Sequence, residues 1–305
     1  MPVLSTKPTR SYNVRSISFP ARSHPSMGKI EERLNKLSST EISSLANAET
    51  IRARLSSLAE IYKCIEDLLN LPLTRQALAK HQEEKWVSDT LEDLINYLDI
   101  CGNTRDNILL MKESVREAQS ALRRSKGGGD LSIESEVNAY ISSRKKMKKQ
   151  ASKSLASLKQ KDRIFTESYM FNSDYHYLLT IVKAIRETSW ITISIISSLL
   201  FFFSVPILKP KNSKWCLLSR LVHKGAAGAC EGQQENMNEL EKVDLALSNL
   251  LVAKDLKLQK IQFTEKMLEI LDISIQEFEN ELECLFRHLI HTRVSLLNIV
   301  SHQLD

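Results

Sequence analysis

The sequence predicts an all-α protein, a long antiparallel helical bundle with coiled-coil-like packing and a disordered N-terminal tail. Glycine and proline, which interrupt helices, number 8 and 7 in 305 residues and lie mostly at the N-terminus or between residues 204 and 232. Elsewhere apolar residues recur at spacings of three and four, the period of one helix face. We therefore expect a single helical bundle domain over residues 30–305.

The predicted tail comprises residues 1–29. It is basic, and no acidic residue precedes Glu31. Such a segment buries too little apolar surface to offset the entropy lost on ordering, so we predict that it is disordered.

The first helical stripe is carried by nine apolar residues at helical spacing. They are Ile42, Leu45, Ala48, Ile51, Leu55, Leu58, Tyr62, Ile65 and Leu69. The sequence "NLPL" (70–73) ends this helix, because Pro72 disfavours helical geometry at the residue before it.

Two further helices follow. One runs from about Glu84 to Arg124 and is stopped by "GGGD" (127–130), with Gly102 marking a place where its interior is weak and a kink is expected. The next starts near Ser132, whose hydroxyl suits an N-cap.

The last helical region has the clearest pattern. Only Thr292 interrupts a three-and-four repeat formed by Leu268, Leu271, Ile275, Phe278, Leu282, Leu285, Leu289, Leu296 and Ile299. This repeat requires an apolar partner along its length. Because the same chain supplies matching stripes, we predict an internal bundle core in preference to a coiled-coil dimer. A flexible linker is predicted before it, at about 206–235.

One apolar stretch raises the question of a membrane. Residues 190–208 ("WITISIISSLLFFFSVPIL") contain no charge over 19 residues, which is long enough to span a bilayer. The alternative is a fully buried bundle helix, with the serines bonded to helix carbonyls or to neighbouring helices. We favour the buried helix.

Few residue patterns point to chemistry. Cys284, His288 and His291 have helical spacing that metal sites use, but no fourth ligand accompanies them, so a core cysteine and surface histidines are favoured. Asp174 and His176 lack a recognisable catalytic motif around them. The sequence therefore predicts no enzyme, no cofactor and no metal.

The densest charge run is "SRKKMKKQASK" (143–153). Its basic residues are Arg144, Lys145, Lys146, Lys148, Lys149 and Lys153. The run resembles a nuclear-import patch, and on a helix it would also suit anionic lipid headgroups. A solvated helix face is the favoured interpretation. The mild net charge of +5 argues against nucleic acid as a partner.

The tail contains a short docking pattern. Arg15, Ser16, Ser18 and Pro20 fit R-S-x-S-x-P, which resembles the phosphoserine ligand of 14-3-3 proteins. Phosphorylated Ser18 would bring close to two negative charges to an Arg cluster. A plastid-type transit peptide and plain disorder remain alternatives for this segment.

Several stretches resemble the plant BYPASS-like family, from about Tyr12 to Ser301. They include "VRSISFPARSHP", "LLNLPLTRQAL", "LDICGNTRDNILLMKESVREAQSALRR", "VNAYISSRKKMKKQASKSL", "KWCLLSRLVHK" and "LECLFRHLIHTRVSLLNIVS". The resemblance implies a plant-specific protein linked to root and shoot development, with no assigned enzymatic activity. Family members usually carry an acidic residue and Gly-Pro in the apolar helix, where this chain has Ser197 and Val205-Pro206.

Together these observations predict a non-enzymatic plant regulator or adaptor that acts through protein–protein contacts. The alternative is a membrane-anchored protein with a single span at about 190–208 and a basic, lipid-facing patch. Five scattered cysteines without a CxxC pair fit a reducing compartment. We therefore expect a cytoplasmic protein, with membrane association as the second choice and plastid or nucleus less favoured.

Overall fold

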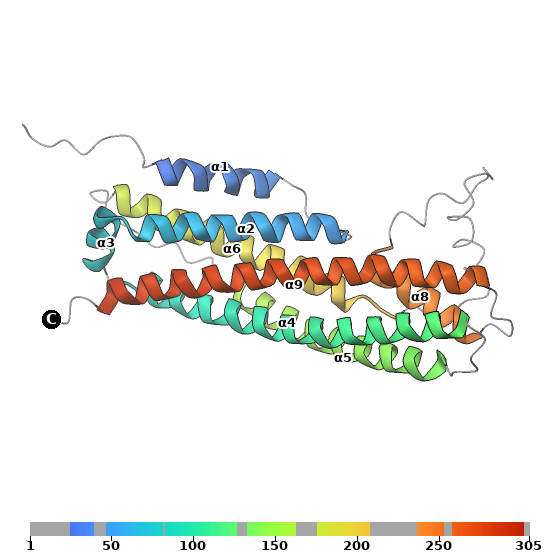
Figure 1. Ribbon diagram of the computed structural model, residues 1–305. Coiled ribbons are helices and arrows are strands. Elements are labelled where there is room, and N and C mark those ends of the chain that lie inside the picture. The colour runs from blue at the N-terminus through green and yellow to red at the C-terminus, as the bar shows by residue number, and fades with distance from the viewer. Residues whose placement is uncertain are drawn as a thin grey trace, which may run out of the picture.

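The computed structural model describes residues 25–39, 47–81, 83–126, 133–162, 176–207, 237–252 and 258–301. Within these ranges the chain forms helices and no strand, which confirms the all-α class. The helices are α1 (Pro25–Ser39), α2 (Ala48–Leu69), α3 (Pro72–Ala79), α4 (Lys85–Lys126), α5 (Ile133–Asp162), α6 (His176–Ser204), α8 (Glu239–Val252) and α9 (Leu258–Ser301). Figure 1 shows the long helices lying side by side in one elongated bundle.

Helix α9 packs along both α2 and α4, and its neighbour α4 runs antiparallel to it. Two ion pairs fix this direction. Arg105 contacts Glu283 at 2.6 Å, whereas Arg116, further along α4, contacts Asp272, earlier in α9, at 3.2 Å. This pair has the predicted antiparallel arrangement.

Helices α2 and α9 depart from that arrangement, because they run parallel. Arg52 contacts Glu277 at 3.4 Å, and Glu66, later in α2, contacts His291, later in α9, at 3.2 Å. The two helices are far apart in sequence, so no short hairpin forces them into opposite directions.

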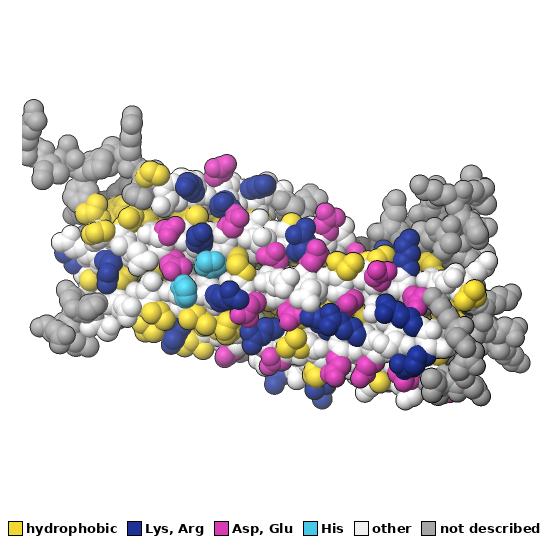
Figure 2. Space-filling view, in the orientation of Figure 1, with side chains coloured by type: hydrophobic (Ala, Val, Ile, Leu, Met, Phe, Trp, Pro, Cys, Tyr) yellow, Lys and Arg dark blue, Asp and Glu magenta, His cyan; other side chains and the backbone are white. Residues whose placement is uncertain are grey.

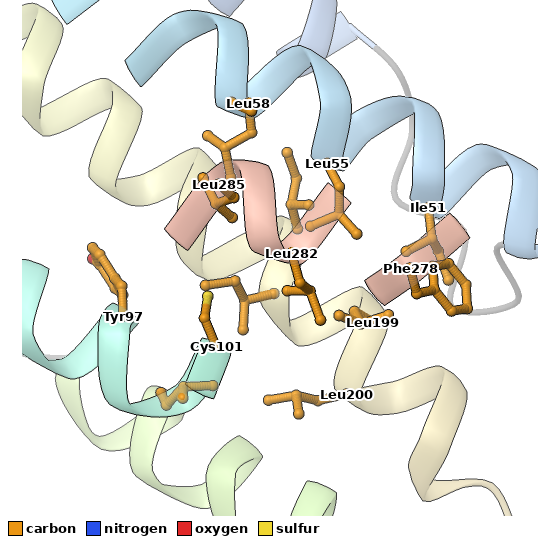
Figure 3. Close-up of a cluster of buried hydrophobic side chains, with 14 of the residues drawn as sticks. Ile51, Leu55, Leu58, Tyr97, Cys101, Leu199, Leu200, Phe278, Leu282 and Leu285 are labelled. Atoms are coloured by element: carbon orange, nitrogen blue, oxygen red, sulfur yellow. The ribbon is translucent and has the colours of Figure 1, made fainter. Parts of the chain in front are cut away.

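The apolar repeat of α9 forms the centre of the bundle, as predicted. Its nine apolar members and Thr292 are all buried, with exposed fractions of 4% or less. Figure 3 shows Phe278, Leu282 and Leu285 of α9 among side chains from α2, α4 and α6. The partners of the repeat therefore come from the same chain.

Helix α2 has clear boundary signals. The Asn47 side chain accepts a hydrogen bond from the backbone N–H of Thr50 at 2.9 Å, which satisfies one free donor of the first turn. The helix ends at Leu69, and Pro72 then starts α3, where its missing N–H costs nothing. The stop at Pro72 is confirmed. Helix α3 was not predicted, because eight residues are too short to display a period.

Helix α1 corrects the predicted extent of the tail. It begins at Pro25, so residues 25–29 are helical and the boundary at residue 29 is wrong. Met27, Ile30, Leu34 and Leu37 form its buried stripe, which packs on α2 and α6. This stripe offsets the ordering entropy of a short, charged helix. Residues 1–24 lie outside the described part of the chain.

Helix α4 runs without interruption through Gly102, so this glycine does not break the helix. A Cβ at Gly102 would lie 3.9 Å from the Phe286 ring, an ordinary contact distance across the α4–α9 seam. Tertiary contacts along the helix outweigh the weak propensity of one glycine. The candidate N-cap of α5, Ser132, lies outside the described residues.

Helix α6 contains most of the apolar stretch 190–208 and packs against α1, α2 and α5. By length and composition it is the single helix, in the described ranges, that could cross a membrane, and 61% of its most apolar window is buried inside the protein. Two of its polar groups have partners in neighbouring helices, whereas the buried hydroxyl of Ser194 has none among the described residues. Thr192 shares a hydrogen bond with the Tyr62 hydroxyl at 2.9 Å, and Ser189 shares one with the Tyr97 hydroxyl at 2.5 Å. Burial in the bundle thus accounts for its composition.

Candidate functional site

The basic run of α5 divides into a buried arginine and exposed lysines. Arg144 is fully buried, which corrects its placement in a basic surface patch. The other five predicted residues stay at the surface, Lys148 partly covered and the rest exposed. Lys159, one further turn along, is exposed as well. We call the set the lysine face: Lys145, Lys146, Lys148, Lys149, Lys153 and Lys159.

The lysine face follows from the burial pattern of α5. The buried positions Val137, Tyr140, Met147, Ala151 and Leu158 share one side of the helix. Residues four apart lie nearly above one another, so Lys145, Lys149 and Lys153 project together from the opposite side.

In the described part of the chain, no carboxylate forms an ion pair with the lysine face. From residue 137 to residue 161 the sequence contains no aspartate or glutamate. By contrast, Figure 2 shows basic and acidic side chains interleaved over α9 and α4.

Arg144 holds three helices together beneath the lysine face. Its Nε donates to Asp244 Oδ2 of α8 at 3.1 Å. Its two Nη atoms donate to the carbonyls of Phe203 at 2.7 Å and Val205 at 2.9 Å. Those carbonyls lie at the C-terminus of α6, where the helix leaves acceptors unsatisfied and favours a cation. Arg144 therefore caps the C-terminus of α6 and ties α5 to it.

Asp244 completes this cluster. Its Oδ1 accepts a hydrogen bond from the Tyr140 hydroxyl at 2.8 Å, and the residue is 2% exposed. Burial raises the pKa of Asp244 to about 6, although the nearby Arg144 charge and the Tyr140 hydrogen bond act in the opposite direction. The carboxylate is thus charged at neutral pH and pairs with the arginine.

A cavity of about 300 Å³ lies beside the lysine face, between α4, α5 and α6. The α4 side presents Asn96, Asn103 and Asn107, whose amides donate to carbonyls of their own helix. Asp99 and Lys153 are the charged residues of its described lining. These groups form no pair of a nucleophile and a base.

The predicted cysteine and histidine residues of α9 do not form a cluster. Cys284 is exposed and free, which corrects its expected place in the core. His288 and His291 approach Glu66 of α2 with Nδ1–Oε distances of 3.6 and 3.2 Å. In the described ranges no group of three His, Cys, Asp or Glu could hold a metal ion. Asp174 and the side chain of His176 lie outside those ranges.

An apolar patch lies on the seam between α4 and α9. The ion pairs of this seam place the first third of α4 against the last third of α9. Its members are Leu91, Ile95, Leu98, Phe286, Ile290 and Val294. Ile95, Ile290 and Val294 are 38–46% exposed. Figure 2 shows apolar side chains gathered there, at the left end of the bundle. Patches of this kind are typical of surfaces that contact other proteins.

The docking pattern of the tail falls outside the described structure. Arg15, Ser16, Ser18 and Pro20 all precede Pro25, the first described residue.

Fold and surfaces together define an all-α bundle protein with a lysine face and a separate apolar patch. The sequence model of the family described as Protein BPS1 matches residues 54–299. The chain therefore belongs to the BPS1 family, which confirms the resemblance to the plant BYPASS-like proteins. No curated protein and no solved structure matches this chain.

Proposed function

We propose that the protein is a non-enzymatic regulatory adaptor that docks on a negatively charged partner through the lysine face. Membership of the BPS1 family supports a role in plant developmental signalling, within which root and shoot development is the proposed process. The observation that carries the proposal is the lysine face itself. Six lysines stand on one rigid helix face without a carboxylate partner in the described structure.

The anchoring of α5 supports this role. An adaptor needs its charges in a fixed arrangement, so that little side-chain and backbone entropy is lost on binding. The buried stripe of α5 and the Arg144–Asp244 pair provide such a support. We place the protein in the cytoplasm, since the free thiols Cys64, Cys101 and Cys284 fit a reducing compartment.

A test of the lysine face uses retention on immobilised polyglutamate. Replacing Lys145, Lys149 and Lys153 with Gln is expected to lower the salt concentration needed for elution. Each lysine that is removed weakens the attraction to polyglutamate, so less salt is needed to screen the attraction that remains. The matched control replaces the exposed Lys29, Lys63 and Lys266 of other helices with Gln and removes the same net charge. Equal elution of the two variants would overturn the proposal, with circular dichroism checking that both are folded.

We propose a second contact, between phosphorylated Ser18 and 14-3-3 proteins. A phosphoserine adds charge and acceptor oxygens that an Arg cluster binds well. Ser18→Ala is expected to abolish recovery of 14-3-3 proteins from plant extract, whereas Ser16→Ala retains it. Unchanged recovery with Ser18→Ala would remove this contact from the proposal.

The membrane-anchored alternative has less support. A single span formed by α6 would separate the Phe203 and Val205 carbonyls from Arg144, leaving a buried arginine beside Asp244 alone. It would also remove the hydrogen bonds of Ser189 and Thr192 to α4 and α2. Lost partners of this kind are costly in a nonpolar environment.

A further inference from the structure

Helix α6 exposes a line of large apolar side chains. Trp190 is 49% exposed, Phe201 45% and Leu179 45%. Successive members are eleven residues apart, which is slightly more than three helical turns, so they point nearly the same way. Since α6 packs against both α1 and α5, this line lies in the opening between those two helices.

The line runs beside the lysine face. Arg144 of α5 binds the carbonyls of Phe203 and Val205, and α5 and α6 run in opposite directions. Because the helices are antiparallel, each step forward along α5 from that contact corresponds to one step backward along α6. This correspondence places Phe201 level with the segment 145–148. The same correspondence places Trp190 within one turn of Lys159.

Two of the six lysines, Lys148 and Lys159, border this line, whereas Lys153 lies on the flank of α5 that lines the cavity. That flank of α5 faces α4, where Ser143 shares a hydrogen bond with Ser114 at 2.7 Å and Gln150 lines the cavity. On a helical wheel Lys148 and Lys159 lie on the flank away from these residues and toward α6. Glu187, the one acid in the sequence of α6, is 3.7 Å from Lys183.

Lysines flanking half-exposed aromatic rings match the chemistry of a bilayer surface. Amines are attracted to anionic headgroups, while tryptophan prefers the boundary between headgroups and acyl chains. An acidic protein would bind to the lysines alone, and its binding would not explain why Trp190 and Phe201 are exposed beside them.

We infer that the α5–α6 surface binds the face of an anionic bilayer, with the lysines on the headgroups and Trp190 and Phe201 at the boundary. The protein lies on the membrane and keeps α6 in its bundle. This inference rests on the proposed function in one respect, that the lysine face is a docking surface.

The experiment is flotation of the full chain with vesicles of phosphatidylcholine, with or without phosphatidylserine. Wild-type protein is expected to float with the phosphatidylserine vesicles only. The Lys145, Lys149 and Lys153→Gln variant is expected to lose about 100-fold in partition coefficient, from the energy of each lysine near an anionic surface. The Lys29, Lys63 and Lys266→Gln control retains binding.

A second measurement tests whether Trp190 in the apolar line of α6 reaches the bilayer. With Trp86→Phe and Trp215→Phe, Trp190 is the remaining tryptophan of the chain. Its fluorescence is expected to be quenched by vesicles whose acyl chains carry bromine. Protein that floats without quenching of Trp190 would overturn the inferred orientation.

The outcomes separate the two proposals. Retention on polyglutamate that depends on the lysine face, without flotation, would overturn the bilayer inference and leave the adaptor function standing with an acidic protein as partner. Flotation and retention that are both indifferent to the lysine face would overturn both.

Discussion

Replacing Phe202 with Ala is expected to lower the free energy of unfolding by about 3–5 kcal/mol, the usual cost of removing a buried aromatic ring. Phe202 is 2% exposed, and its ring lies 5.3 Å from those of Phe203 and Phe278 in edge-to-face contacts. The loss combines reduced apolar burial, a cavity at the α6–α9 contact and the missing ring contacts. Denaturant unfolding followed by circular dichroism measures it.

The neighbouring residue provides a matched control. Phe201→Ala removes the same atoms from a side chain that is 45% exposed, and we expect a loss below about 1 kcal/mol. If α6 left the bundle for a bilayer, both rings would lose their protein environment. Equal effects of the two substitutions would therefore contradict the buried position of α6.

The second large effect is expected at Arg144. Arg144→Met is predicted to cost about 3–5 kcal/mol at neutral pH, because it leaves the Asp244 carboxylate buried without its cation. The substitution also removes the donors to the carbonyls of Phe203 and Val205. Lys149→Met, an exposed site on the same helix, is the control and is expected to change stability by no more than about 0.5 kcal/mol.

The pH dependence of this loss can be derived from Asp244. Its pKa is raised from 3.8 to about 6 in the folded state, chiefly by burial. The folded protein holds this proton more tightly than the unfolded chain does, so protonation of Asp244 stabilises the fold. This contribution to the free energy of unfolding is complete below pH 3.8 and is lost as the pH rises through about 6. Without Arg144 the pKa rises further, and the loss continues above that value.

The deficit of Arg144→Met relative to wild type is therefore expected to be larger near neutral pH than at mildly acidic pH. Adding Asp244→Asn removes the uncompensated charge and should restore part of the stability at neutral pH, with Tyr140 still able to donate to the amide oxygen. A deficit that is independent of pH would show that the charge of Asp244 is not its cause.

Some elements were predictable because their local pattern and their packing agree. The α9 repeat is regular over its whole length, so any apolar partner would bury the same residues. Pro72 acts through its own backbone geometry and needs no tertiary contact to end α2. By contrast, α1 was hidden because its short stripe adjoins a basic, proline-containing tail. Its helix is stable through contacts with α2 and α6.

The candidate site was predicted in part, because its charges are visible in the sequence whereas their burial depends on contacts between helices. The charge run was evident, and the spacing of four places Arg144 on the same side of α5 as Tyr140, but the sequence could not show that Arg144 is buried there against Asp244. Asp244 was overlooked, although an aspartate inside the apolar segment "VDLALSNLLV" is a signal of a buried partner. The aromatic line of α6 also needed the structure, because every residue of that stretch is apolar or small and its exposed side is set by its neighbours.

Sequence alone determined the helical class, the central stripe of α9 and the presence of a basic segment, because periodicity and charge are local properties of a chain. Tertiary structure decided which charges are buried, that α2 and α9 run parallel, and that α6 is surrounded by protein over most of its surface. Those features depend on which helices meet across long sequence separations. Burial and electrostatic partnership are set by such contacts, so no local pattern contains them.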